Sequence, residues 1–282
     1  MAIVCHDLKL LFIMVPGTGC SVVGKVLTEQ FGGKYLPEND IIKGGRIVHQ
    51  RKHNSLSQIL QDGLIDKDLL RDYTIAATVR NPYDHFVTYY QRIIGDWHEY
   101  SLGVQKRMAD RRRASLSEHE YNALKEAIER ARVRAKRRRR LLRVTGFDMW
   151  LMWTVLHSIA HAGKSHKQTT GNALRNILFP MLDGVDVVLR SERLEEGLNT
   201  LLRKLGSDTK VDLPRLNTTP GKKPYTAYYS GLAVYVVEKL FRRQLDEFGY
   251  AFGEVPKGDP LVWLTDKNVQ ERALPRRLEV SA

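Results

Sequence analysis

The sequence predicts an α/β fold with a central, mainly parallel sheet flanked by helices. Three short apolar runs, at residues 8–15, 73–79 and 185–189, have the length and composition of strands buried on both faces. Stretches with helical periodicity separate these runs, as parallel strands require, because each must be joined to the next by a crossover connection. The length of 282 residues fits one large domain or two small ones, and we expect a single domain over residues 1–282.

The first strand leads into a glycine-rich turn, Pro-Gly-Thr-Gly-Cys-Ser, at residues 16–21. Ser21 is a suitable N-cap for a helix over residues 22–31, which the Gly32-Gly33 pair ends. Such a turn points several backbone N–H groups and the positive end of the helix dipole at one spot, where an anion fits. The hydroxyls of the turn would add donors, and the lysine that follows would add a full charge. The residues expected at this site are Gly17, Thr18, Gly19, Cys20, Ser21 and Lys25.

Three interpretations of this turn remain open. Residues 19–25 nearly fit the nucleoside-triphosphate pattern G-x-x-x-x-G-K-[ST], but Val26 stands where that pattern needs a Mg²⁺-binding hydroxyl. The turn could instead hold a phosphosulfate group. It could also be a plain strand-to-helix turn with a solvated Lys25.

Shorter elements lie between the first and second strands: a weaker strand at 46–49 and helical segments at 56–60 and 67–70. The second strand stops at Arg-Asn-Pro, and Pro82 suits the first turn of a helix that runs to about residue 94, because its missing N–H would have no partner there.

Arg80 follows this second strand directly, at the edge of the sheet where ligands of open α/β folds bind. Thr88 lies about two turns along the next helix, so its hydroxyl can face back toward the Arg80 guanidinium. A guanidinium and a hydroxyl together suit a phosphate monoester. The alternative is that Arg80 pairs with Asp84 and that Thr88 is an ordinary helix residue.

Later in the chain we expect a buried amphipathic helix at 147–160, a helix at 194–205 ended by Gly206, and a long helix at 226–248. The tail at 254–282 contains three prolines and no clear periodicity, so we expect it to wrap the surface or to lie loose.

Residues 101–146 form a basic helical insertion. The segment holds 15 basic and 5 acidic residues, a net charge of +10, so the rest of the chain carries only +3 of the total of +13. Ser117 and Glu120 make a capping-box pair, so a helix is expected to begin there. Few of its residues are apolar, which indicates a protrusion rather than core.

Composition restricts the class of protein. A hydrophobic fraction of 43% excludes wholesale disorder, and two cysteines exclude a disulfide scaffold. The positive charge calls for an anionic partner. The only apolar run near the N-terminus is far shorter than the ~20 residues of a spanning helix, so we expect a cytoplasmic protein without a transmembrane segment. No metal-binding pattern of histidines or cysteines is present.

The motifs together resemble the sulfotransferases that use 3′-phosphoadenosine 5′-phosphosulfate (PAPS), in particular the carbohydrate-type members. Residues 15–21 resemble the family's phosphosulfate loop, and Arg80 with Thr88 has the spacing of its 3′-phosphate motif. Residues 185–194 and the C-terminal part of the chain up to residue 252 resemble later family elements. The resemblance implies a P-loop-like α/β fold and PAPS as co-substrate, without a metal. It also implies transfer of a sulfuryl group to a hydroxyl-bearing acceptor, expected to be a saccharide, either neutral or anionic.

The resemblance also implies functional residues. Family members place their general base between the two anion sites, where this chain has His49 and His53; His53 is preferred, with Glu38 and Asp40 as alternatives. Asn217 and Lys222 are expected to close over the nucleotide.

The chain departs from the family at Gly17, where the family loop normally has a lysine. Lys25 or Lys52 would have to supply that charge, or the protein binds nucleotide but catalyses poorly.

Two other functions compete with this hypothesis. One is a P-loop kinase or nucleotide hydrolase, which Val26 counts against. The other is a nucleic-acid-binding protein that uses the basic insertion, although no helix-turn-helix, RNA-recognition or zinc motif accompanies the arginines.

Overall fold

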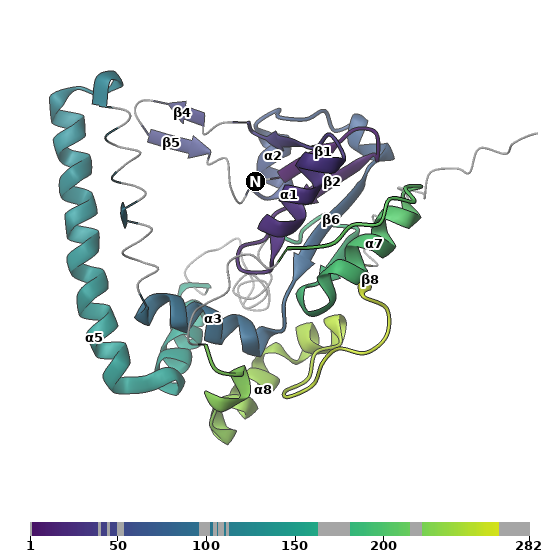
Figure 1. Ribbon diagram of the computed structural model, residues 1–282. Coiled ribbons are helices and arrows are strands. Elements are labelled where there is room, and N and C mark those ends of the chain that lie inside the picture. The colour runs from purple at the N-terminus through teal and green to yellow at the C-terminus, as the bar shows by residue number, and fades with distance from the viewer. Residues whose placement is uncertain are drawn as a thin grey trace, which may run out of the picture.

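A six-stranded sheet with the order β3-β1-β2-β6-β7-β8 forms the centre of the molecule (Figure 1). The computed structural model describes residues 2–38, 41–43, 46–49, 54–95, 102–103, 106, 110, 113–162, 181–214 and 222–264. The strands of the main sheet are β1 (Ala2–Cys5), β2 (Leu10–Ile13), β3 (Lys34–Leu36), β6 (Thr74–Val79), β7 (Val187–Arg190) and β8 (Leu261–Trp263). A separate hairpin pairs β4 (Ile41–Lys43) with β5 (Arg46–His49).

The three central strands run parallel. Leu10 of β2 lies opposite Thr74 of β6, and Ala76 of β6 lies opposite Val187 of β7. The outer pairings, β1 with β2, β1 with β3 and β7 with β8, are antiparallel. The predicted α/β fold with a parallel centre is therefore confirmed. Because the carboxyl ends of β2, β6 and β7 meet at one edge, the segments that follow them lie side by side.

Two predictions about strands need correction. The strand predicted at 8–15 is present but shorter, as β2, because residues 6–9 form the turn of a hairpin between β1 and β2 and the strand ends at Ile13. The tail that begins at residue 254 is not wholly irregular, since β8 pairs with β7 at the edge of the sheet.

The helices agree with the predicted positions with small shifts. They are α1 (Cys20–Gln30), α2 (Leu56–Gln61), α3 (Pro82–Ile94), α5 (Glu118–Ala162), α7 (Leu194–Lys204) and α8 (Gly231–Phe248), with the 3₁₀ turns η1 (Leu69–Asp72), η2 (Arg113–Ser115), η3 (Ser191–Arg193) and η4 (Tyr225–Ala227). The N-cap of α1 is Gly19 rather than Ser21, which lies inside the first turn. The segment at 67–70 forms only a 3₁₀ turn.

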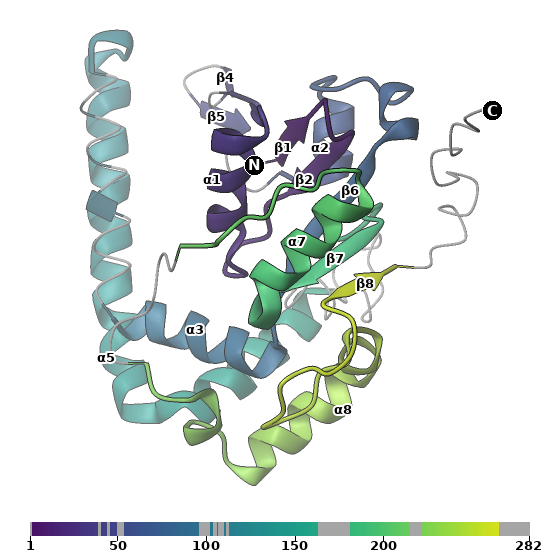
Figure 2. The same ribbon diagram turned by 45° about the vertical axis from the view of Figure 1, so that its right-hand side comes forward.

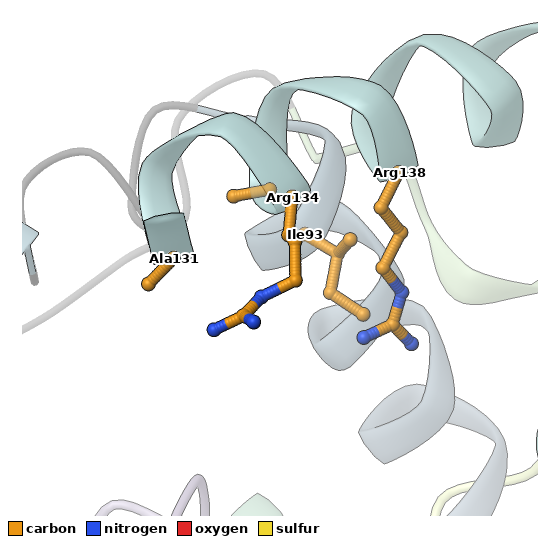
Figure 3. A pocket seen from close by; sticks show the side chains of 5 residues that line it. Ile93, Ala131, Arg134 and Arg138 are labelled. Atoms are coloured by element: carbon orange, nitrogen blue, oxygen red, sulfur yellow. The ribbon is translucent and has the colours of Figure 1, made fainter. Parts of the chain in front are cut away.

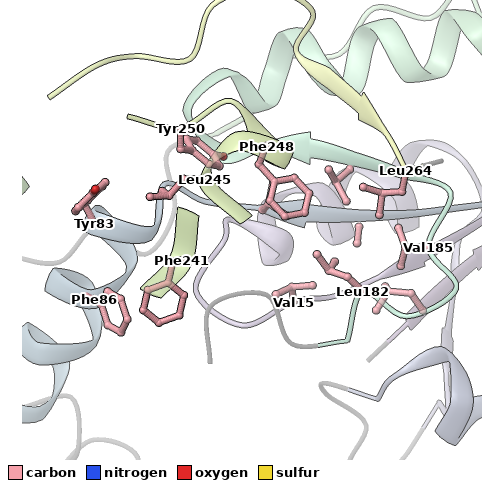
Figure 4. Packing of buried hydrophobic residues seen from close by; sticks show 14 of the residues in the cluster. Val15, Tyr83, Phe86, Leu182, Val185, Phe241, Leu245, Phe248, Tyr250 and Leu264 are labelled. Atoms are coloured by element: carbon pink, nitrogen blue, oxygen red, sulfur yellow. The ribbon is translucent and has the colours of Figure 1, made fainter. Parts of the chain in front are cut away.

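Side chains that alternate along the strands build two apolar layers. On β2, Leu11 and Ile13 face a core shared with α2, α3, α8 and the last part of α5. Leu10 and Phe12 face the opposite layer, which α1 and α7 cover (Figure 2). Figure 4 shows Phe241, Leu245 and Phe248 of α8 packed in the first core. Because both faces of the sheet are covered, its exposed carboxyl-end edge is the natural place for a ligand.

Helix α5 consists of two parts that meet at Gly146. Gly146 has a φ of 78°, a left-handed conformation that interrupts the helix. The part after it buries Phe147, Trp150 and Leu151 in the core, as predicted for this segment. The part before it, residues 118–145, stands away from the sheet and is called the basic arm below (Figure 1).

The start of the basic arm has the predicted capping box. The Ser117 hydroxyl accepts the N–H of Glu120 at 3.2 Å, and a Glu120 carboxylate oxygen accepts the N–H of Ser117 at 2.9 Å.

Candidate functional site

The glycine-rich loop between β2 and α1 has two residues in the left-handed region. Gly17 has a φ of 80° and Gly19 a φ of 83°. No described side chain caps α1 at Gly19, and the N–H of Val22 donates to the Gly19 carbonyl at 3.0 Å, so the positive end of this 11-residue helix lies at the loop. A Cβ on Gly19 would come within 2.8 Å of Leu194 Cδ2, so that side chain would have to shift, and the φ of 83° itself disfavours any other residue here.

Hydroxyl groups hold this loop against the neighbouring strands. Thr18 is 1% exposed, and its hydroxyl donates to the carbonyl of Val15 at 2.8 Å and also bonds the Thr78 hydroxyl. Its hydroxyl therefore fixes the loop, and the expectation that it donates to an anion is not met in this conformation. Ser21 is exposed on the first turn of α1, whereas Cys20 is buried in the core.

Arg80 connects the loop to α3. Its Nη1 atom donates to the Gly17 carbonyl at 3.0 Å, and its Nε atom donates to Asp84 Oδ2 at 2.7 Å. The pairing of Arg80 with Asp84 that the sequence offered as an alternative is thus present. The same guanidinium nevertheless touches the glycine-rich loop, so the two predicted anion sites are adjacent.

Lys222 joins this group from the segment before η4. Its ammonium group donates to the Thr88 hydroxyl at 2.9 Å and forms an ion pair with Asp84. Thr88 is only 3% exposed, and it lies one turn after Asp84 on α3. Arg80 and Lys222 therefore share one carboxylate, which leaves a surplus positive charge beside a buried hydroxyl. This is the arrangement expected for a phosphate monoester.

The ionisation of this group follows from its surroundings. Burial acts to raise the pKa of Asp84, but the charges of Arg80 and Lys222 outweigh burial and hold that pKa below its usual value. Burial, and then the charge of Arg80, lowers the pKa of Lys222. Asp84 is therefore ionised at neutral pH.

Two residues that sequence reasoning missed lie next to Gly17. A Cβ placed on Gly17 would lie 3.5 Å from Cε1 of His85 and 3.7 Å from Nη1 of Arg92. Both residues belong to α3, and the helical spacing of Asp84, Thr88 and Arg92, four residues apart, was the signal that could have found Arg92. Burial, followed by the charges of Arg80 and Arg92, lowers the pKa of His85 to about 3, so this imidazole is neutral.

The turn after β7 braces the site from the other side. The Ser191 hydroxyl bonds the carbonyl of Val79 at 2.8 Å and that of Thr18. The Glu192 carboxylate accepts the N–H of Asn81 at 2.7 Å and the hydroxyl of Tyr250 at 3.0 Å. The pKa of Glu192 lies above its usual value, because burial raises it more than these hydrogen bonds lower it. The segments after all three parallel strands are thereby fixed to one another.

Several predicted site residues are not brought into this group. Lys25 lies exposed on α1, with its ammonium 3.9 Å from the Glu29 carboxylate one turn further on. His53 and Asn217 lie outside the described residues, as does the side chain of His49, whose backbone belongs to β5.

The position after Lys25 bears on the nucleoside-triphosphate interpretation. Val26 is 3% exposed and packs in the core between α1 and the sheet. A Mg²⁺-binding hydroxyl at this place would point into the core instead of toward the loop, so α1 lacks this feature of a P-loop nucleotide hydrolase.

The basic arm forms a second positive region. A recess between α3 and α5 is lined by apolar side chains and by two arginines one turn apart, whose guanidinium groups extend into it (Figure 3). These residues are Ile93, Ala131, Arg134, Ala135 and Arg138. Arg138 also lies over the ring of Trp153, 5.6 Å from its centroid.

Comparison with known proteins agrees with the geometry. The family model described as "Sulfotransferase family" matches residues 1–251. Searches of curated proteins and of solved structures returned no significant match. Within the described ranges, no helix combines the length and hydropathy of a membrane span. No three His, Cys, Asp or Glu side chains among those same residues are grouped to hold a metal ion.

Proposed function

The chain belongs to the sulfotransferase family, and from this premise we propose that it moves a sulfuryl group from PAPS to a hydroxyl of a carbohydrate acceptor. The proposal rests on one group of side chains, which hydrogen bonds and ion pairs join to one another: Arg80, Asp84, Thr88 and Lys222. Arg80 also donates to the Gly17 carbonyl, so this group lies against the glycine-rich loop. PAPS has a 3′-phosphate and a 5′-phosphosulfate, so it needs two anion sites close together. The Thr88–Lys222 pair fits the first group, and the loop before α1 fits the second.

The reaction is an in-line displacement at sulfur. The acceptor oxygen forms a bond to sulfur while the bond from sulfur to the 5′-phosphate oxygen breaks, and that oxygen keeps the electron pair. The hydroxyl proton passes to a base. By analogy with phosphoryl transfer, the protein contributes mainly by positioning the groups and by stabilising charge on the departing oxygen.

We assign the base to His53, with His49 as the alternative; this assignment rests on the sequence and on the family resemblance. The positive charge of neighbouring Lys52 would favour the neutral imidazole that a base requires. In the same proposal Asn217 and Lys222 belong to a segment that closes over the nucleotide.

A saccharide acceptor that carries negative charge would suit the basic arm. For location we propose the cytoplasm, because Cys5 and Cys20 are both buried free thiols, as a reducing compartment would keep them.

Titration with adenosine 3′,5′-bisphosphate, the nucleotide product, tests the proposal. We expect binding without Mg²⁺, and we expect Thr88→Val to weaken it about 10-fold, because the variant removes a hydroxyl donor and keeps the shape of the side chain. Thr88→Ser should retain most of the affinity. Affinity for adenosine 5′-phosphate should not change in Thr88→Val, since that nucleotide lacks the 3′-phosphate. Binding of Mg²⁺–ATP in place of the bisphosphate would reject the proposal.

A further inference from the structure

Gly17 of the loop lies beside two side chains of α3. In Figures 1 and 2 the loop between β2 and α1 reaches toward α3. The nearest atoms to a Cβ on Gly17 would be those of His85 and Arg92, at 3.5 and 3.7 Å. The φ of 80° also strains any residue with a side chain here. Both distances are ordinary van der Waals contacts, so the Arg92 guanidinium lies beside the loop at Gly17, and it is the backbone conformation that favours glycine here.

Arg92 lies on the face of α3 that carries the rest of the site. Thr88 is one turn before it and Asp84 two turns before it, so these side chains follow one line along the helix. The line has two cationic ends. At one end Lys222 contacts Thr88, and at the other Arg92 lies beside the loop, with Arg80 touching both regions. A ligand with two anionic groups could therefore meet a cation at Thr88 and another at Gly17.

The electrostatics agree with this arrangement. Burial, and then the charge of Arg80, acts to lower the pKa of Arg92. This effect agrees with the geometry, in which both guanidinium groups lie near the loop at Gly17 in partly buried surroundings, where solvent screens the attraction of an anion less. His85 next to them stays neutral and adds no further charge.

We propose that Arg92 binds the 5′-phosphosulfate end of the nucleotide and stabilises the charge that develops on the departing phosphate oxygen. This inference rests on the proposed function. It assigns to a helix residue the charge that Gly17 cannot supply from the loop. It also ranks Arg92 above Lys25, whose ammonium lies beside Glu29 on the exposed side of α1.

Binding of two different nucleotides distinguishes the two ends of the site. Adenosine 3′,5′-bisphosphate carries both phosphates, whereas adenosine 3′-phosphate lacks the group assigned to Arg92. We expect Arg92→Gln to weaken binding of the bisphosphate about 10- to 100-fold and to leave binding of the 3′-phosphate within about twofold of wild type. Arg92→Lys should give an intermediate loss, because it keeps the charge but not the fork of donors. The sulfuryl-transfer rate of Arg92→Gln should fall at saturating PAPS.

For each variant, the affinity for the bisphosphate is compared with the affinity for adenosine 3′-phosphate. A loss of folded protein would lower both affinities alike, so the ratio of the two does not depend on the stability of the variant. Arg71→Gln is the matched control, since Arg71 lies on the exposed turn η1 and pairs only with Asp68 at 3.0 Å among described residues. An equal loss for both nucleotides, or no loss for either, would overturn the inference. So would a selective loss in Lys25→Gln together with none in Arg92→Gln. If wild-type protein binds neither nucleotide, the proposed function itself fails, which is a different result.

Discussion

The basic arm and the site at Gly17 are both positively charged, but they hold their charges differently. In the site, the side chains of Arg80 and Lys222 are 24% and 14% exposed, and they converge from different elements on one carboxylate. In the arm, Arg130 is 61% exposed and pairs with Glu126 of its own helix, one turn away. Each exposed ion pair of this kind stabilises a folded protein by less than about 1 kcal/mol.

The difference shows that the number of charges is a poor guide to function. Most of the net charge of the chain lies in residues 101–146, yet the group suited to a nucleotide uses a few residues that tertiary structure brings together. Convergence and partial burial strengthen an interaction with an anion, because solvent screens it less. An exposed row of arginines instead attracts anions over a wide area with little geometric selection.

The largest effect should follow from removing Arg80. We expect Arg80→Met to weaken binding of adenosine 3′,5′-bisphosphate by about 100-fold or more, because it removes a partly buried cation and frees the Gly17 carbonyl. Isothermal titration calorimetry measures this change. Arg130→Met removes the same charge from the arm and should change the affinity less than twofold. Similar losses in both variants would mean that overall charge, not convergence, governs binding.

An intermediate effect should appear in the dependence of stability on pH. The pKa of His85 lies at about 3 in the folded chain, because of burial and of the nearby Arg80 and Arg92, whereas an unfolded histidine titrates near about 6.5. As the pH falls below about 6.5, only the unfolded state takes up this proton, so stability is lost progressively toward pH 3. The slope approaches about 1.4 kcal/mol per pH unit.

Urea unfolding between pH 5 and pH 7.5 tests this prediction. The slope should be shallower in His85→Gln than in wild type, while His157→Gln, on the exposed side of α5, should keep the wild-type slope. Equal slopes in all three proteins would show that His85 takes up a proton when folded.

The smallest effect on the nucleotide should come from the arm. We expect Arg134→Gln with Arg138→Gln to leave affinity for adenosine 3′,5′-bisphosphate within about twofold, and to weaken binding of heparin, a polyanionic saccharide, about two- to fivefold. Binding measured from 50 to 300 mM NaCl should show a smaller salt dependence in the double variant. Unchanged heparin affinity would remove the arm from acceptor recognition, and a preference for RNA over heparin would favour the nucleic-acid hypothesis.

The central strands and α3 could be predicted because their signals are local. The run at 73–79 is apolar and bounded by Arg-Asn-Pro, and Pro82 begins α3 as expected. Strand β1 was missed because four residues carry almost no periodicity, and its place depends on pairing with β2 and β3. Strand β8 was missed for the same reason, since it belongs to the sheet only through β7.

The site was partly predictable for a related reason. Arg80 and Thr88 lie near one another in sequence, so helix geometry alone suggested that they could face one ligand. The four-residue spacing after Thr88 could place Arg92 on the same face of α3, but the closeness of Arg92 to the loop depends on how α3 packs, which no local pattern encodes. Thr18 was given a donor role because hydroxyls are common in such loops, but Thr78 and Val15 lie within bonding distance of it in the fold.

The break at Gly146 has a consequence for how this protein can change over evolution. The helix after Gly146 is anchored in the core by Phe147 and Trp150, whereas most residues before it are exposed. The end of the arm contacts α3, where Tyr90 donates to the Leu142 carbonyl and Arg143 to the Ile94 carbonyl. Substitutions at exposed positions near the start of the arm therefore place little strain on the sheet. The exposed start of the arm can therefore change its charge and its partners without a matching change in the group around Gly17.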